Sequence, residues 1–264
     1  MKHQSKFIFL LLSLIAVSYW ACTKSSPSEQ NKSTVSAQVV GGQIALNLKQ
    51  ILYGEYGTFS IADGIDEPIT MSAKQKNHLK IQSTNDGTPE CGFKVDTAFS
   101  FDFDLSDTAK FNIWTKIKYE AFCKNEVFSG ISVYDSLNVS ATTSAYTIQL
   151  KSGETLVITK LTPGSRTSQL TMNGSLNSYS NVQPKKASEK PMIGSYNFNF
   201  TGLTIDPVKR GDIINGMATF ATKGSSAEGV WDYKGTIIFL GDHKAKITIN
   251  GSAYTYDLET IQGV

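Results

Sequence analysis

The sequence predicts a mainly β protein, an antiparallel meander that forms a curved sheet, an open barrel or a sandwich, with one N-terminal amphipathic helix. Two observations predict the sheet. Apolar and polar residues alternate through most of the chain after residue 90, and short turn-forming segments separate the alternating stretches. A third observation predicts the helix, because apolar residues recur at helical spacing in the segment 41–56.

The first element along the chain is a secretory signal in residues 1–21. A basic start precedes the apolar run 7–17, which is too short to span a bilayer, and the small residue Ala21 comes just before Cys22. Residues 22–36 are polar and lack hydrophobic periodicity, so we expect a flexible tether that joins an anchor at Cys22 to the folded domain.

A cysteine at this break resembles the signal peptides of bacterial lipoproteins of the Bacteroidota type. The resemblance implies that Cys22 is diacylated and becomes the first residue of the mature chain. The protein would then be held by a lipid anchor in the bacterial cell envelope, on the periplasmic side or at the cell surface. The alternative is cleavage after residues 16–18, an A-x-A-like site that would leave Cys22 unmodified.

The charge balance excludes one class of partner. The chain has 25 basic and 23 acidic residues, and Lys2 and Lys6 are the only formally charged residues before Cys22. Removing the signal therefore leaves 23 of each sign. A mature chain without net formal charge gives no electrostatic basis for binding nucleic acid.

The next element is the helix predicted in the segment 41–56. Its apolar stripe consists of Ile44, Leu48, Ile51 and Leu52. We expect it to begin near Ser36, to end at Gly54 or Gly57, and to cover an open face of the sheet. Residues 57–90 are less regular, and residues 83–89 are typical of a loop.

A β-hairpin stapled by a disulfide follows. Cys91 and Cys123 form an even pair once Cys22 is assigned to lipid, and a disulfide is the expected state of such a pair in an exported protein. Residues 93–103 and 111–121 both carry apolar side chains at odd positions. Pairing the two cysteines places Phe103 opposite Phe111, Phe101 opposite Ile113, Val95 opposite Tyr119, Asp104 opposite Lys110, Asp96 opposite Lys118 and Lys94 opposite Glu120. One register therefore satisfies an apolar face, three charge pairs and the disulfide.

The remaining elements are short strands. A first group is predicted at 127–140, 145–150, 155–161 and 167–176, with connections at 152–154 and 163–164. A second group is predicted at 193–205, 213–221, 229–240, 244–250 and 253–258, with tight turns at 241–243 and 250–251. The segment 181–191 between them, with two prolines and three lysines, is interpreted as a linker or long loop. We expect one domain over 37–264, with a sub-division near 181–191 as the alternative, because each half alone would expose a broad apolar face.

No catalytic motif, metal-ligand cluster or cofactor-binding motif is present in the sequence, so we expect neither enzymatic activity nor a cofactor. His78 and His243 lie in different segments, and His243 is interpreted as a solvated turn residue. Asp102 and Asp104 share one strand face, like a glycosidase carboxylate pair, but we interpret them as a solvated face because Asp104 is matched with Lys110.

Two tryptophans are the candidate ligand-stacking residues. Trp114 falls on the polar face of the hairpin, opposite Ser100, and Trp231 lies in a later strand. An exposed tryptophan on a sheet suits the stacking of a sugar or the docking of a partner, whereas a second layer over the sheet would bury it.

Three short patterns resemble the O-glycosylation acceptor that some Bacteroidota use on exported proteins. The resemblance implies modification of Thr97, Thr108 and Ser136. The pattern is permissive, and about one match is expected by chance at this composition.

The leading functional hypothesis is a lipid-anchored cell-envelope protein that acts as a non-enzymatic binding or structural module. Its partners would be the membrane, through the anchor, and a glycan, a lipid or another envelope protein. The order of elements loosely resembles that of periplasmic lipoprotein carriers, which implies the alternative of a hydrophobic ligand held in a cavity between helix and sheet. A further alternative is an envelope hydrolase without a recognisable motif.

Overall fold

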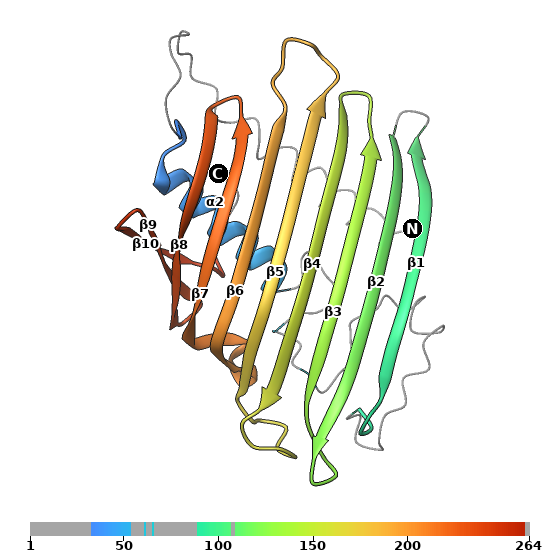
Figure 1. The fold of residues 1–264 in the computed structure, drawn as a ribbon, viewed down its shortest axis with the longest axis vertical. Helices are drawn as coiled ribbons and strands as arrows, with labels where there is room; N and C mark the ends of the chain where they lie inside the picture. The colour runs from blue at the N-terminus through green and yellow to red at the C-terminus, as the bar shows by residue number, and fades with distance from the viewer. Residues whose placement is uncertain (1–32, 54–60, 62–64, 66–88, 107–108, 262–264) are drawn as a thin grey trace.

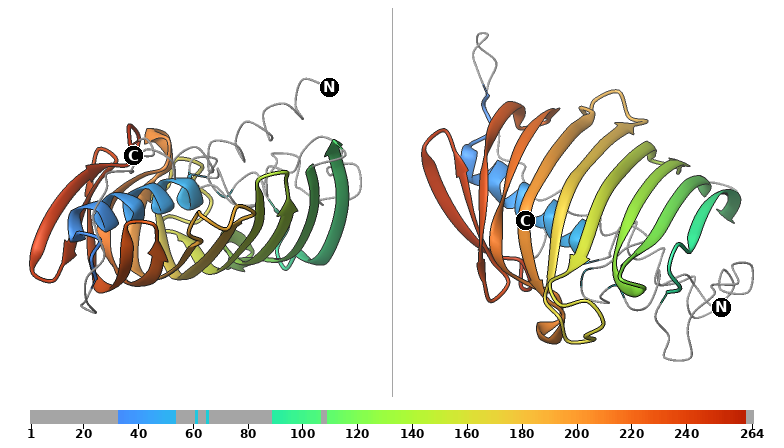
Figure 2. Two further views of the ribbon diagram at one scale, coloured as in Figure 1. Left: turned by 90° about the horizontal axis from the view of Figure 1, so that it is seen from above. Right: turned by 60° about the horizontal axis from the view of Figure 1, so that its bottom comes forward.

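In the computed structural model, the chain forms an antiparallel sheet of ten strands that follow one another in chain order (Figure 1). The structure describes residues 33–53, 61, 65, 89–106 and 109–261. The sheet is curved and is not closed into a barrel (Figure 2). The predicted meander is therefore confirmed, and among the three predicted architectures the chain adopts the open curved sheet.

Strands β1 to β8 are long, whereas β9 and β10 have six residues each, and every strand pairs with its neighbour in sequence because the connections within the meander are short. The elements are α2 Ala37–Leu52, β1 Lys94–Ser106, β2 Ala109–Lys124, β3 Val127–Thr142, β4 Tyr146–Lys160, β5 Leu170–Pro184, β6 Met192–Asp206, the 3₁₀ turn η2 Pro207–Lys209, β7 Asp212–Ser226, β8 Gly229–Gly241, β9 Lys244–Ile249 and β10 Ser252–Asp257.

Helix α2 forms in the predicted region and begins at the predicted cap. The Oγ of Ser36 accepts a hydrogen bond from the backbone N–H of Val39 at 3.3 Å, which satisfies one of the free donors of the first turn. The last helical residue is Leu52, just before the predicted end at Gly54. Figure 2 shows α2 inside the curve of the sheet, over its C-terminal half. The side of the sheet that carries α2 is called the concave face below, and the other side the convex face.

The β1–β2 hairpin has the predicted register from the Lys94–Glu120 pair to the Asp104–Lys110 pair and shifts only next to the turn, at Ser106 and Ala109. Phe103 lies opposite Phe111, and Ser100 lies opposite Trp114. Two of the predicted charge pairs form ion pairs, Lys94–Glu120 at 2.8 Å and Asp96–Lys118 at 2.9 Å, and the third pair, Asp104 and Lys110, is also in register. The alternation and the pairing of like faces thus determine the register, as expected for a half-buried hairpin.

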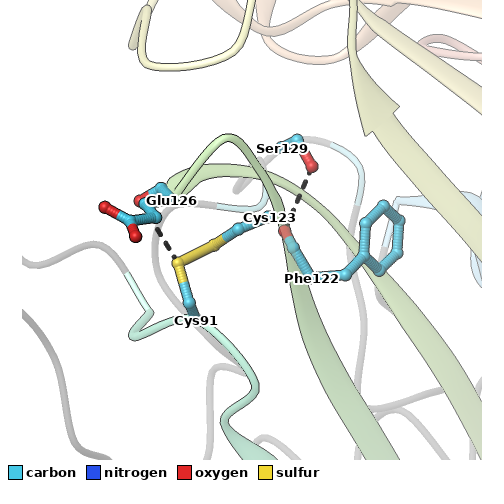
Figure 3. Close-up of a disulfide and its surroundings, with 5 residues drawn as sticks. All are labelled: Cys91, Phe122, Cys123, Glu126 and Ser129. Carbon is cyan, nitrogen blue, oxygen red and sulfur yellow. Dashed lines mark hydrogen bonds between the residues drawn. A yellow bond between two sulfur atoms is a disulfide. The ribbon is translucent and has the colours of Figure 1, made fainter.

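The predicted disulfide joins Cys91 to Cys123 at the open end of this hairpin (Figure 3). Ser129 is inserted on β3 beside Cys123 as a β-bulge, and its Oγ donates to the carbonyl oxygen of Phe122 at 3.2 Å. The Sγ of Cys91 lies 3.4 Å from the carbonyl oxygen of Glu126 in the β2–β3 turn. The disulfide therefore connects β1 to the bulged end of the next hairpin.

The predicted connection at residues 152–154 is wrong, because β4 runs through these residues without a break. Ser152, Gly153 and Glu154 pair with β3 on one side and with β5 on the other. Ser-Gly-Glu is a typical turn composition, but two neighbouring ladders satisfy the backbone groups of this segment and keep it extended. The same position carries a buried side chain, since Glu154 is 7% exposed.

The predicted linker at 181–191 is also too long. Strand β5 continues to Pro184, and β6 begins at Met192, so the connection comprises residues 185–191. Val182 pairs with Met192 directly across this connection. The two groups of strands predicted from sequence therefore belong to one continuous sheet.

The two predicted tight turns near the C-terminus are confirmed. Asp242 and His243 connect β8 to β9 with φ of 51° and 54°, and Asn250 and Gly251 connect β9 to β10 with φ of 50° and 84°. Left-handed conformations at both central residues match the twist of the strands they join.

The core lies on the concave face. Its main cluster includes α2 and side chains from the strands, among them Ile44 and Leu48 of the helix and Ile237 and Ile247 of β8 and β9, which are at most 1% exposed. A second, smaller cluster lies near one end of β2 to β5 and consists of Phe111, Ala141, Tyr146, Ile148 and Val182. The apolar alternation predicted from the sequence therefore points toward the helix side of the sheet.

Candidate functional site

The convex face carries a row of aligned side chains that crosses the strands. Because successive residues of a strand point to opposite faces, Trp114 lies on the face opposite to its buried neighbour Ile117. The register of each strand pair aligns one residue of every strand from β1 to β8 with Trp114. This row, called the Trp114 row below, is Ser100, Trp114, Asn138, Lys151, Tyr179, Ser195, Lys223 and Asp232.

The side chains of the Trp114 row differ in their exposure to solvent. Trp114 and Tyr179 are half-buried, whereas Lys151 and Lys223 are exposed. In the views of Figures 1 and 2, α2 lies on the concave side, and no described helix covers the convex face. The sequence had left open whether a second layer buries Trp114, and within the described part of the chain the ring keeps access to solvent.

The flanking positions of the convex face are rich in amides and hydroxyls, above all on β5 and β6. They are Asn173, Ser175, Asn177, Asn181, Gln183, Asn197, Asn199 and Thr201. Two of these side chains bond to each other, since the Nε2 of Gln183 donates to the Oδ1 of Asn181 at 2.7 Å. Such groups form hydrogen bonds with hydroxyl-rich ligands as well as with water.

Trp231, the other candidate stacking residue, lies on the concave face. It is 5% exposed and belongs to the main core cluster. Its Nε1–H donates to the Oγ1 of Thr222 at 3.0 Å, and its ring lies over Gly224. This side chain is therefore unavailable for stacking at the surface, because burial and a satisfied donor give it a role in the core.

The remaining predicted positions are dispersed. Thr97 is half-buried on the concave face, and Ser136 is half-buried on the convex face. Cys22, Thr108 and His78 lie outside the described residues.

The carboxylates considered for a glycosidase-like pair lie on the convex face of the hairpin. Asp102 accepts a hydrogen bond from the Nδ2 of Asn112 at 2.6 Å, and Asp104 lies opposite Lys110. Both aspartates are exposed. Their contacts agree with the interpretation of a solvated polar face.

His243 has more contacts than a solvated turn residue would have. Its Nδ1 lies 3.2 Å from the hydroxyl of Tyr53 at the end of α2, and its backbone N–H donates to the Oδ1 of Asp212 at 2.8 Å. The other carboxylate oxygen of Asp212 accepts from the backbone N–H of Asp242 at 2.9 Å. Burial, followed by the charges of Asp212 and Glu259, raises the pKa of the Tyr53 hydroxyl. These contacts hold the β8–β9 turn against the helix.

A buried acidic pair on the concave face was not predicted from the sequence. Asp135 of β3 and Glu154 of β4 lie directly opposite each other and are 3% and 7% exposed. Thr115 donates to the Oδ1 of Asp135 at 3.4 Å. Burial, followed by the charge of Asp135, raises the pKa of Glu154 to about 8. The pair could have been found from the β3–β4 register, which places Asp135 opposite Glu154. The prediction of a turn at 152–154 was incompatible with that register.

The interface between helix and sheet is packed. Val40, Ile44, Ala45 and Leu48 of α2 are at most 1% exposed and belong to the same apolar cluster as the strands. At the edge of this interface, polar side chains of the helix meet the sheet. Gln43 accepts from the hydroxyl of Tyr196 at 3.2 Å, and Asn47 accepts from the Oγ of Ser178 at 3.3 Å.

Two further kinds of feature are absent from the described residues. These residues include no group of three or more histidine, cysteine, aspartate or glutamate side chains arranged to hold a metal ion. In the same part of the chain, no helix has the length and apolar character needed to cross a membrane.

Comparisons with protein-family models, with curated proteins and with solved structures find no match to this chain. Of the features above, the Trp114 row combines solvent access with side chains suited to bind a ligand.

Proposed function

We propose that this protein is a lipid-anchored protein of the bacterial cell envelope that acts as a non-enzymatic glycan-binding module. The observation that carries the proposal is the half-buried Trp114 on the convex face, aligned with Tyr179 in a row bordered by amide and hydroxyl side chains. Aromatic rings stack on the apolar faces of sugars, and neighbouring amides bond to their hydroxyls. A binding face on the outside of a sheet needs no cleft.

The cysteines support the anchor. The chain has three, and Cys91 and Cys123 are joined to each other. Cys22 is thereby left without an intramolecular disulfide partner, as expected for a residue that carries lipid. Mass spectrometry of the mature protein tests this, because a diacylated first residue supports the anchor and an unmodified Cys22 thiol refutes it.

The packed interface beneath α2 favours a binding module over a carrier of hydrophobic ligands. A carrier would need a cavity where the helix meets the sheet, and in the described structure apolar side chains of both elements pack together there. Extraction of the purified protein with organic solvent tests the carrier hypothesis, which would require a stoichiometric bound lipid.

Binding of the full chain to a glycan array, with detergent holding the anchor in solution, tests the proposed function. We expect binding to one class of glycan that Trp114→Ala abolishes. The matched control is Phe101→Ala, which removes another exposed aromatic ring, on the opposite face of the sheet and 40% exposed. Absence of binding, or equal losses in both variants, would reject the convex face as a glycan site.

A further inference from the structure

The convex face of strands β3 to β7 carries lysines but no carboxylate in its middle. Between residues 127 and 226, Asp135 and Glu154 lie on the concave face, and the other carboxylates lie in the β5–β6 loop or at the β6–β7 end of the sheet. Lys151 and Lys223, by contrast, lie on the convex face and are exposed. The middle of this face is therefore locally cationic from β4 to β7, and on β8 the exposed Asp232 of the Trp114 row lies opposite Lys223.

Among the described residues neither lysine forms an ion pair, although Asp232 is the cross-strand neighbour of Lys223. The lysines of β2 differ, because Lys116 and Lys118 contact the carboxylate of Asp96 at 3.9 Å and 2.9 Å. A cation without a partner on an exposed face attracts anionic ligands, and its side chain keeps the freedom to reach them.

Aromatic and cationic side chains alternate along the Trp114 row. Trp114 lies on β2, Lys151 on β4, Tyr179 on β5 and Lys223 on β7. Adjacent strands lie about 4.8 Å apart, so the two aromatic residues are separated by about 14 Å, and so are the two lysines. A linear ligand that crosses the strands would therefore meet a ring, a cation, a second ring and a second cation in turn.

We infer that the convex face binds an acidic linear polysaccharide, such as a uronic acid polymer, laid across the strands along the Trp114 row. The inference rests on the proposed function and adds the charge and direction of the glycan. Trp114 and Tyr179 would stack on sugar rings, and Lys151 and Lys223 would contact the carboxylates. The flanking amides of β5 and β6 favour a polysaccharide over an anionic lipid surface, since they match hydroxyl groups that a bilayer surface lacks in this density.

Isothermal titration calorimetry of the full chain in neutral detergent tests the inference with two probes, an oligogalacturonate and a neutral cello-oligosaccharide of matched length. We expect the oligogalacturonate to bind about tenfold more tightly, and we expect high salt to remove the difference. The double variant Lys151→Gln/Lys223→Gln should lower the affinity for the oligogalacturonate to that of the neutral probe. The control Lys124→Gln, which removes an exposed charge at the β2–β3 turn, should retain the preference.

The outcomes separate this inference from the proposed function. Equal binding of both probes, still dependent on Trp114, would overturn the acidic ligand and leave glycan binding intact. Binding of neither probe or any array glycan would overturn both proposals. Equal binding of oligogalacturonate and of vesicles containing an anionic lipid, unaffected by Trp114→Ala, would overturn the polysaccharide in favour of a membrane surface.

Discussion

Asp135 and Glu154 face each other across β3 and β4 on the concave side of the sheet, and both are almost fully buried. The Oε1 of Glu154 has no hydrogen-bond partner among the described residues. Removal of a carboxylate from water disfavours its charged form, and the neighbouring Asp135 adds to this effect. Glu154 therefore keeps its proton at neutral pH, and this protonation makes stability depend on pH.

The first prediction concerns that pH dependence. The pKa of Glu154 is about 8 in the folded chain, against a reference value of 4.5, so between these values the folded state holds a proton that the unfolded state has lost. The contribution is complete below about pH 4.5 and is lost as the pH rises through about 8. The free energy of unfolding should fall by about 1 kcal/mol per pH unit in this window.

Glu154→Gln should remove this slope and stabilise the protein at pH 8 and above, because the amide cannot ionise. Urea denaturation across the pH range measures the effect. The matched control is Glu228→Gln, an exposed glutamate, which should keep the wild-type slope. Parallel slopes in wild type and Glu154→Gln would show that Glu154 is not the titrating group.

The second prediction concerns the disulfide, which joins cysteines 32 residues apart. The double variant Cys91→Ser/Cys123→Ser should lower the free energy of unfolding by about 3–4 kcal/mol, because the unfolded chain regains its freedom. Guanidinium denaturation of the variant and of reduced wild type should agree. Cys22→Ser serves as the control and should leave the value unchanged; a similar loss in that variant would contradict the assignment.

The third prediction compares neighbouring glycines of α2. A Cβ on Gly41 would lie 2.6 Å from the hydroxyl oxygen of Tyr256, whereas a Cβ on Gly42 would have no neighbour closer than 3.9 Å. Gly42→Ala should therefore stabilise the protein by about 0.5–1 kcal/mol through helix propensity. Gly41→Ala should destabilise it by about 1 kcal/mol or more, because Tyr256 must move away from its bond to the carbonyl oxygen of Gln38.

Thermal unfolding monitored by circular dichroism distinguishes the two glycine variants. Tyr256→Phe in the Gly41→Ala background should restore part of the lost stability, because it removes the clashing hydroxyl. Equal stabilisation by Gly41→Ala and Gly42→Ala would show that α2 does not pack against Tyr256 at Gly41.

The fourth prediction concerns the buried indole of Trp231. Thr222→Val removes the acceptor of its Nε1–H while conserving volume, and should cost about 1–3 kcal/mol because a buried donor is left unsatisfied. Thr222→Ser keeps the hydroxyl and should cost less. Denaturation followed by tryptophan fluorescence measures both, and a larger loss in Thr222→Ser than in Thr222→Val would point to packing of the methyl group rather than to the hydrogen bond.

The hairpin shows how far sequence patterns determine structure here. Its cysteines, alternating faces and charge pairs all require the same register. The structure has that register from the Lys94–Glu120 pair to the Asp104–Lys110 pair. The start of α2 at Ser36 could also be predicted from the sequence, because a helix cap depends on residues close together in the chain.

Sequence patterns gave the wrong structure, or left it open, where pairing with strands distant in the chain determines it. Residues 152–154 have the composition of a turn, yet pairing with both β3 and β5 keeps them in a strand. Trp114 and Trp231 look alike as strand tryptophans, but Trp114 lies on the convex face and Trp231 lies in the core on the concave face. The difference depends on which face of the sheet receives α2.

Local patterns were thus enough to predict the meander, the helix cap, the hairpin register and the disulfide, because each rests on residues close in the chain or on strict alternation. Three features could be seen only in the folded chain: the open sheet, the burial of Glu154 beside Asp135, and the alignment of Trp114 with Lys151 and Tyr179. These features arise from the alignment of many strands and from the docking of α2 on one face, which no local pattern encodes.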